Sequence, residues 1–306
     1  AVLQRAFELA CKENEVAEDF KMAIIAMGKT GGRELNYISD VDVIFVAGDD
    51  LDDDEMQIAT KIANRLMRII DSTSAEPGLW EVDPNLRPEG KDGAMVRRLK
   101  SHLSYYQKWA KNWEFQALIK ARFVAGDEQT GKDYEQTVGV LAWDSLDSSR
   151  VVEEVRGMRK RVLDNLPQEQ RETNLKLGNG GLRDVEFTIQ LLQLVHGRHD
   201  ESVRSANTLE AIQALTNASY LGRKDAKAFT EHYIYLRSVE HRLQLQGLKR
   251  THLLPQADQM RELSRSIDPK KDPASFSNSL SVVRKEVKEM HENVFFRPLL
   301  NMVADL

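Results

Sequence analysis

Two aspartates separated by a single residue are the strongest chemical signal in the sequence. Asp40 and Asp42 begin the segment 40–46, DVDVIFV, whose β-branched and aromatic residues predict a buried strand. Residues two apart on a strand point to the same face, so both carboxylates are expected side by side while Val41 and Val43 face the core. Two such oxygen ligands suit Mg²⁺, which typically binds one or two carboxylates together with substrate phosphates. The pattern alone also fits two acids at an exposed strand edge.

A third acid is expected at the end of a neighbouring strand. The segment 79–83, LWEVD, is a short strand candidate closed by Pro84, and Asp83 stands at its end. Glu81 lies two residues earlier on the same face and competes for this role. Three acids on neighbouring strand ends would form a two-metal site for nucleotidyl transfer, in which each metal stabilises the attacking or the leaving oxygen at phosphorus.

A glycine pair lies between the first predicted strand, 22–27, and the two aspartates. Gly31 and Gly32 would let backbone N–H groups approach phosphate oxygens closely. Lys29 beside them either contacts a phosphate or is an ordinary solvated lysine. The tripeptide 28–30, GKT, looks like the end of a P-loop, but that motif needs a glycine five positions before its final Gly-Lys pair. Ala23 occupies that position, so the sequence excludes a P-loop.

A second glycine cluster precedes an apolar helix predicted at 182–196. The loop contains three glycines, Gly178, Gly180 and Gly181. Because Lys176 and Arg183 flank this entry into a helix N-terminus, the loop is a candidate phosphate-binding site. Polar residues recur three and four apart along the helix, at Arg183, Glu186, Gln190 and Gln193. This stripe either lines a cleft or is an ordinary solvent face on which Arg183 pairs with Glu186.

Strand predictions are confined to the first part of the chain. Before about residue 130 they alternate with helices predicted at 2–11, 56–72 and 94–123. No strand is predicted after residue 123, and the remaining predicted elements are helices at 150–165, 182–196, 208–220, 223–246, 256–266 and 273–296. The sequence therefore predicts an α+β fold, with a small α/β catalytic domain at 1–130 and an all-helical domain at 131–306 that closes the active-site cleft.

Composition excludes several classes of protein. The 306 residues contain 43 Lys and Arg against 48 Asp and Glu, a net charge of −5 that provides no basic footprint for general nucleic-acid binding. The single cysteine, Cys11, rules out an intrachain disulfide and a cysteine zinc cluster, and it fits the reducing cytoplasm. No apolar run approaches the ~20 residues of a membrane-spanning helix. The chain begins without methionine inside a helical pattern, which suggests a segment of a longer protein.

Five segments together resemble one known family. They are 28–45 (GKTGGRELNYISDVDVIF), 82–93 (VDPNLRPEGKDG), 105–122 (YYQKWAKNWEFQALIKAR), 175–197 (LKLGNGGLRDVEFTIQLLQLVHG) and 236–246 (LRSVEHRLQLQ). In this order they are similar to the glutamine synthetase adenylyltransferase/adenylyl-removing enzymes. Thr30 stands where that family's pattern has an apolar residue.

The resemblance implies a polymerase β-like nucleotidyltransferase domain followed by a helical bundle. It implies that Asp40 and Asp42 are the metal pair and Asp83 the third acid. It also implies that Gly31, Gly32 and Ser39 belong to the nucleotide-phosphate loop.

The same resemblance implies substrates, cofactors and partners. Two Mg²⁺ ions would act with ATP or ADP and phosphate, glutamine synthetase would be the protein substrate, and a PII-type signalling protein would be a regulator. The residues of 28–45 and of the segment GGLRDVEF favour the N-terminal, adenylyl-removing half of the family's enzymes. The adenylylating half, a related uridylyltransferase and a non-catalytic nucleotide-binding module remain alternatives.

Overall fold

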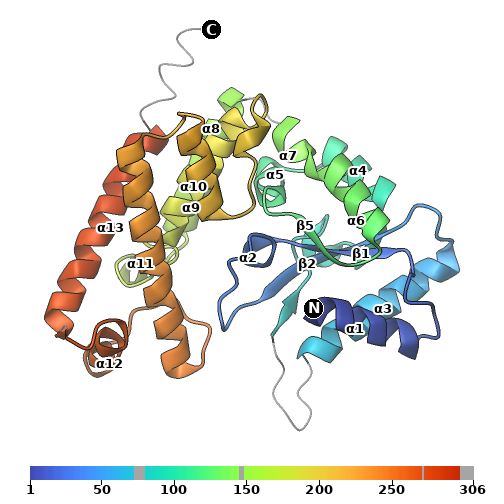
Figure 1. Cartoon of the computed structure of the whole chain (residues 1–306), viewed down its shortest axis with the longest axis horizontal. Coiled ribbons are helices and arrows are strands. Elements are labelled where there is room, and N and C mark those ends of the chain that lie inside the picture. The colour runs from blue at the N-terminus through green and yellow to red at the C-terminus, as the bar shows by residue number, and fades with distance from the viewer. Residues whose placement is uncertain (72–79, 145–147, 271, 297–306) are drawn as a thin grey trace. The chain divides into compact units, whose positions relative to one another are not determined.

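A computed structural model describes residues 1–71, 80–144, 148–270 and 272–296 (Figure 1). Backbone contacts divide the chain into two compact units. The first comprises residues 1–145 together with the short segment 205–207, and the second comprises 146–204 and 208–306. The sequence predicts a boundary at residue 130, whereas the contacts divide the chain after residue 145 and assign 205–207 to the first unit.

A five-stranded mixed sheet forms the centre of the first unit. Its strands are β1 (Met22–Ala26), β2 (Val41–Ala47), β3 (Val82–Asp83), β4 (Val96–Arg98) and β5 (Arg122–Gly126). The order is β3-β2-β1-β5, and β4 also pairs with β2. β1 is antiparallel to both β2 and β5, while β2 is parallel to β3 and to β4. β2, which contains Asp42 and directly follows Asp40, is therefore held by partners on both sides.

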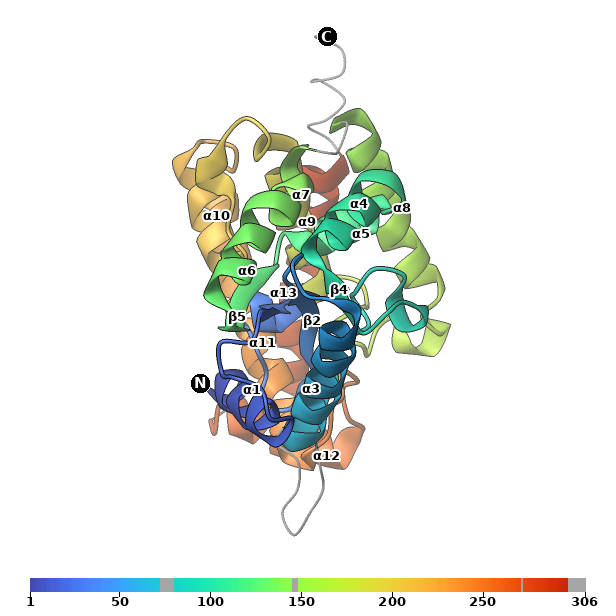
Figure 2. The same ribbon diagram turned by 90° about the vertical axis from the view of Figure 1, so that its right-hand side faces the viewer.

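Helices cover both faces of this sheet (Figures 1 and 2). α1 (Val2–Glu13) and α3 (Asp53–Asp71) pack on one face, where they share a core with alternate residues of β1 and β2. The predicted inward positions Val41 and Val43 belong to this core, as the strand period requires. The other face is covered by α4 (Leu99–Lys108), α5 (Asn112–Leu118), α6 (Glu128–Tyr134), the π-helical turn Glu135–Gly139 and α7 (Leu141–Asp144).

The prediction of one helix over 94–123 is wrong, as is the expectation that no strand follows it. This segment instead forms β4, α4, α5 and the start of β5. β5 exists because it pairs with the free edge of β1, with Ala23 opposite Gly126 and Ala26 opposite Arg122. Because that edge lies about a hundred residues earlier in the chain, a local pattern cannot reveal the pairing.

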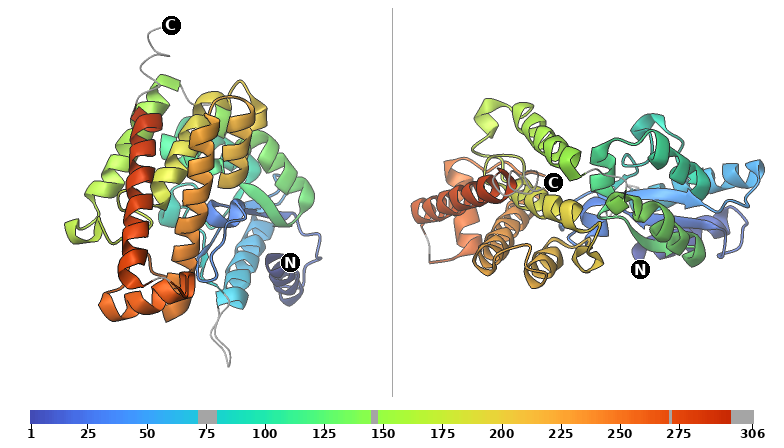
Figure 3. Two further views of the ribbon diagram at one scale, coloured as in Figure 1. Left: turned by 60° about the vertical axis from the view of Figure 1, so that its left-hand side comes forward. Right: turned by 90° about the horizontal axis from the view of Figure 1, so that it is seen from above.

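The second unit is all-helical in its described residues. Its main helices are α8 (Ser148–Asp164), α9 (Leu182–His196), α10 (Thr208–Asn217), α11 (Arg223–Gly247), α12 (Ala257–Ile267) and α13 (Pro273–Phe296). They confirm the helices predicted in this region, with bounds that differ by a few residues at most. α9, α11 and α13 contact one another and run side by side (Figure 3).

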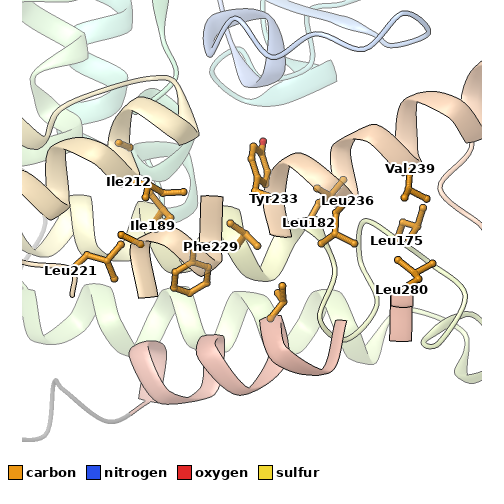
Figure 4. Packing of buried hydrophobic residues seen from close by; sticks show 14 of the residues in the cluster. Leu175, Leu182, Ile189, Ile212, Leu221, Phe229, Tyr233, Leu236, Val239 and Leu280 are labelled. Carbon is orange, nitrogen blue, oxygen red and sulfur yellow. The ribbon is translucent and has the colours of Figure 1, made fainter. Parts of the chain in front are cut away.

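The core of the second unit comes from apolar residues at helical spacing (Figure 4). Leu182 and Ile189 of α9 pack with Phe229 and Leu236 of α11 and with Leu280 of α13, and all five are buried. α9 is buried on nearly every side, and its polar residues Glu186, Gln190 and Gln193 are buried with it. In the described part of the chain, no helix has both the length and the apolar character needed to cross a membrane.

A buried histidine links the first unit's stability to pH. His102 lies on the inner side of α4, where its ring meets Tyr134 edge-on with the ring centroids 5.5 Å apart. Burial, reinforced by the charge of Arg97, lowers the pKa of His102 from 6.5 to about 3. The unfolded chain therefore binds a proton that the folded chain excludes. This contribution to stability is complete above pH 6.5 and is lost as the pH falls from 6.5 toward 3.

Lowering the pH from 7 to 5 is expected to reduce the unfolding free energy by about 2 kcal/mol through His102 alone. Urea unfolding of the wild type and of His102→Leu at both pH values measures this contribution. The variant should lose about 2 kcal/mol less than the wild type, while His199→Leu, at an exposed histidine, should follow the wild type. Equal pH dependence of wild type and His102→Leu would contradict the assignment.

Candidate active site

Asp42 and Asp83 are direct neighbours across two parallel strands. The register of β2 with β3 pairs Val41 with Val82 and Asp42 with Asp83. Adjacent strands lie about 4.8 Å apart, and paired residues point to the same face. The structure therefore brings these two predicted acids side by side at the start of β2.

Asp40 and Ser39 lie in the segment that leads into β2. Asp40 is buried, with 8% of its surface exposed, and Ser39 is half-buried. The Val41 amide donates to the Glu81 carbonyl at 2.8 Å, which ties this segment to the residue before β3. Glu81 itself is exposed, while Asp83 holds the paired position opposite Asp42. The register favours Asp83 over Glu81 as the acid beside Asp42.

A short helical turn, α2 (Gly28–Gly31), packs directly against Asp42. Gly28 has a φ of +50°, and a Cβ at this position would collide with the Oδ2 atom of Asp42. The Met27 amide also donates to the Asp42 carbonyl at 2.9 Å. Glycine is needed here both for the left-handed backbone and for the close approach to the carboxylate. The predicted glycine turn and the predicted acid thus lie together.

The glycine pair serves a different purpose from the one expected. A Cβ on Gly31 would collide with the Lys120 carbonyl, so the missing side chain allows close backbone packing. The Gly31 amide donates to the Met27 carbonyl at 2.8 Å and the Gly32 amide to the Gly28 carbonyl at 3.1 Å. These two N–H groups bind the turn itself, and the expectation that they face phosphate has no support in this geometry.

Other residues of the same loop are also held by side-chain contacts. Lys29 Nζ donates to Asn36 Oδ1 at 3.4 Å, so this lysine contacts the loop that leads to the aspartates. Glu34 and Lys120 form a buried ion pair next to Gly32. Sequence reasoning missed Lys120, because the available signal was only a charged residue directly after the apolar run 117–119.

The second glycine loop is closed by its own hydrogen bonds. The first amides of α9, at Leu182 and Arg183, donate to the carbonyls of Leu175 and Lys176 at 2.9 and 3.0 Å. A Cβ on Gly180 would collide with the backbone of Arg284 in α13. These contacts explain the loop as a packing element of the second unit, in place of the amide-lined phosphate site considered from the sequence.

Asp184 secures this loop and was missed by sequence reasoning. It accepts from Arg159 Nε at 2.5 Å and from the Gly180 amide at 2.7 Å, and all three residues are buried. His291 Nε2 lies 3.7 Å from the same carboxylate. An acid in the first turn of a helix was the available signal, since such acids commonly bind nearby amides.

Lys176 and Arg183 lie near each other in the second unit. Burial lowers the pKa of Lys176, and the charge of Arg183 lowers it further, although Glu186 acts in the opposite direction. Arg183 lies 3.5 Å from Glu186 and places its guanidinium over the Phe187 ring at 5.1 Å. The predicted pairing of Arg183 with Glu186 is therefore present. The rest of the stripe is not an ordinary solvent face, because Glu186, Gln190 and Gln193 are buried.

The carboxylates of the first unit fit Mg²⁺ as a pair. Asp42 and Asp83 supply hard oxygen ligands from adjacent strands, and Mg²⁺ typically needs only one or two carboxylates when phosphate completes its coordination. Among residues 1–71, 80–144, 148–270 and 272–296, no three histidine, cysteine or acidic side chains gather closely enough to hold a metal ion. A metal set of Asp40, Asp42 and Asp83 therefore stays a prediction.

Comparison with known proteins gives concordant matches over both units. The family model described as glutamate-ammonia ligase adenylyltransferase matches residues 1–137, and the model described as GlnD PII-uridylyltransferase matches residues 156–295. The bifunctional glutamine synthetase adenylyltransferase/adenylyl-removing enzyme of Streptomyces coelicolor is 49% identical over 100% of this chain and 32% of that protein. Its counterpart in Streptomyces avermitilis is 51% identical over 94% of this chain and 29% of that protein. The chain, which spans about a third of the length of these relatives, belongs to the family of bifunctional glutamine synthetase adenylyltransferase/adenylyl-removing enzymes.

Proposed function

We propose that this chain is a Mg²⁺-dependent nucleotidyltransferase unit that removes or adds AMP on a tyrosine of glutamine synthetase, with removal favoured. The observation that carries the proposal is the pairing of Asp42 with Asp83 on adjacent parallel strands, beside the Gly28 turn. Homology to adenylyltransferase/adenylyl-removing enzymes along the chain supports the same activity. The first unit would then have a polymerase β-like nucleotidyltransferase fold.

Each predicted site residue has a role in this proposal. Asp40, Asp42 and Asp83 would hold two magnesium ions, which supply Lewis-acid stabilisation of charge at phosphorus when bound. Asp83 would also accept the proton of the attacking group. Lys29 and Ser39 would contact the nucleotide phosphates, and Gly31 and Gly32, whose own amides bond within the turn, would allow that turn to pack closely at the nucleotide site.

The reaction is a displacement at phosphorus that runs in one of two directions. In removal, an oxygen of orthophosphate attacks the phosphorus of the adenylyl group. A new P–O bond forms as the P–O bond to tyrosine breaks, which releases ADP and the free tyrosine hydroxyl. In addition, a tyrosine hydroxyl attacks the α-phosphate of ATP and pyrophosphate leaves. Both directions need the same carboxylates and the same contacts to phosphate.

The helical unit would take part in substrate binding and regulation. Lys176 and Arg183 would contact phosphate oxygens as cationic side chains. The match of this unit to a PII-uridylyltransferase model supports a PII-type signalling protein as its regulator. The proposed compartment is the cytoplasm, in keeping with the single buried cysteine.

The favoured direction predicts a specific product. Incubation of the chain with adenylylated glutamine synthetase, Mg²⁺ and phosphate should release ADP, which chromatography detects. The matched reaction with unmodified glutamine synthetase and ATP should transfer little AMP. Absence of ADP together with AMP transfer from ATP would reverse the assignment and identify the adenylylating half.

A second candidate is a uridylyltransferase acting on a signalling protein, and the match of residues 156–295 favours it. Transfer from UTP in preference to ATP would establish it in place of the first. A non-catalytic module would instead bind ATP without dependence on Mg²⁺ and would turn over none of these substrates.

A further inference from the structure

We propose that Arg122 and Asn207 are positioning residues that fix the Gly28–Gly31 turn against the Asp42 carboxylate. The proposal rests on the proposed function, because it assigns these residues to the same nucleotide site. Neither residue stands out in the sequence: Arg122 begins an edge strand, and Asn207 lies far along the chain. Their importance comes from the atoms that they bind.

Arg122 and Asn207 together bind three consecutive carbonyls at the end of the turn. Arg122 Nη2 donates to the Thr30 carbonyl at 3.2 Å, and its Nε donates to the Gly31 carbonyl at 2.9 Å. Asn207 Nδ2 donates to the next carbonyl, that of Gly32, at 2.9 Å. Carbonyls at a helix C-terminus lack partners within the helix, and in a helix of four residues most of its carbonyls are in that position. Distant side chains supply donors to these carbonyls, of which that of Thr30 also accepts from the Arg33 amide at 3.3 Å.

The chemistry of Arg122 suits orientation as well as binding. Its planar guanidinium donates through two nitrogens in a fixed fork, so bridging Thr30 and Gly31 resists rotation of the turn. A positive charge beside a helix C-terminus is also electrostatically favourable. A lysine at this position offers one point of contact and lacks the fork.

The opposite end of the same turn meets the acid. Gly28 lies against Asp42 Oδ2, only four residues and about 6 Å of helix from the Gly32 carbonyl. A rotation of the turn at the three carbonyls that Arg122 and Asn207 bind therefore changes how Gly28 and Lys29 lie relative to Asp42. Catalysis by positioning is sensitive to such changes, since a displacement of about 1 Å can cost a hundredfold in rate.

Asn207 lies in a short segment that interrupts the second unit along the chain. Residues 205–207 belong to the first unit by their contacts, although the flanking segments, Glu201–Val203 and α10, belong to the second. A Cβ on Gly32 would also approach the Ala206 carbonyl to 2.8 Å, so this segment packs closely on the glycine pair. The Gly28–Gly31 turn is therefore bound by a residue whose neighbours along the chain belong to the second unit.

The test compares four variants of the whole chain with a matched control. Arg122→Gln, Arg122→Lys and Asn207→Ala, called the clamp variants, remove or weaken the hydrogen bonds to the three carbonyls. Asp42→Asn reports on the proposed metal site. Arg98→Gln is the control, because Arg98 also donates to a distant backbone carbonyl, that of Leu51, but at the far end of β2. For each variant, kcat and KM for orthophosphate with adenylylated glutamine synthetase, the Kd of a fluorescent ATP analogue with Mg²⁺, and the thermal midpoint are measured.

A positioning role predicts a loss that does not follow stability. Arg122→Gln should lower kcat/KM about tenfold to a hundredfold, Asn207→Ala about tenfold, and Arg122→Lys should keep an intermediate value. Arg98→Gln should keep kcat/KM within about twofold even where its thermal midpoint falls equally. If Arg122→Gln does not fold, Arg122→Lys and Asn207→Ala decide the question by the same measurements.

The outcomes separate this inference from the proposed function. Folded clamp variants with kcat/KM and Kd within about twofold of the wild type, alongside an inactive Asp42→Asn, would overturn the positioning role alone. Full turnover by Asp42→Asn would overturn the proposed metal site. If no protein turns over, the Kd of the ATP analogue decides: unchanged binding in every clamp variant overturns the inference, and weakened binding in them but not in Arg98→Gln supports it.

Discussion

Replacement of Asp42 by asparagine is expected to reduce turnover by about a thousandfold or more while the chain stays folded. An asparagine side chain would keep the shape of the aspartate and lose the charge that binds a divalent cation. A metal that stabilises the transition state by about 4 kcal/mol corresponds to this factor in rate. Because Asp42 lies directly opposite Asp83, its replacement would leave Asp83 without a paired carboxylate in the register of the two strands.

Steady-state assays at saturating Mg²⁺ and circular dichroism test this expectation together. Asp40→Asn should behave like Asp42→Asn. A comparison of turnover in Asp83→Asn and Glu81→Gln determines which of these two acids completes the site. Asp19→Asn carries the same change of charge at an exposed position of the same unit, and it should leave turnover unchanged. Wild-type activity in Asp42→Asn would contradict the proposed metal site.

Replacement of Asp184 by asparagine is expected to cost about 3–5 kcal/mol of unfolding free energy in the helical unit. The change leaves the Arg159 guanidinium buried without the carboxylate that accepts from it at 2.5 Å. It also weakens the hydrogen bond from the Gly180 amide, which holds the glycine loop against α13. Burial of an uncompensated charge is among the largest single effects on stability.

Chemical unfolding followed by circular dichroism measures this loss. Glu289→Gln in α13 is the matched control, because Glu289 lies 3.9 Å from Lys285 in an exposed pair and should change stability by less than about 1 kcal/mol. The double variant Asp184→Leu with Arg159→Met removes both charges and should be more stable than Asp184→Asn. A loss under about 1 kcal/mol in Asp184→Asn would show that the buried pair is not a stabilising element.

Helices of the second unit and the two central strands could be predicted from the sequence. α9 and α13 begin and end where the sequence places them, because an amphipathic or apolar helix repeats its pattern every 3.6 residues over several turns. β1 and β2 are short apolar runs bounded by glycine and acidic residues, which is a local property too. Asp40, Asp42 and Asp83 are candidates because side chains alternate between the two faces of a strand and because Asp83 stands at the end of a predicted strand.

Glycine roles could not be predicted from the sequence alone. Gly31 and Gly180 both precede or follow polar residues in a manner typical of phosphate loops. Each is instead accounted for by a backbone that packs against it, from Lys120 in one case and Arg284 in the other. A glycine pattern indicates close approach but does not tell whether a ligand or another part of the chain approaches.

The sequence by itself determined which residues could do chemistry, and tertiary structure decided which of them meet. The expectation that Asp40 and Asp42 share a face follows from the period of a strand, which is a local property of the backbone. The pairing of Asp42 with Asp83, the edge position of β5, and the hydrogen bonds of Arg122 and Asn207 to one turn all join distant segments. Register and long-range contacts depend on which surfaces the folded core buries together, and no local repeat encodes that choice.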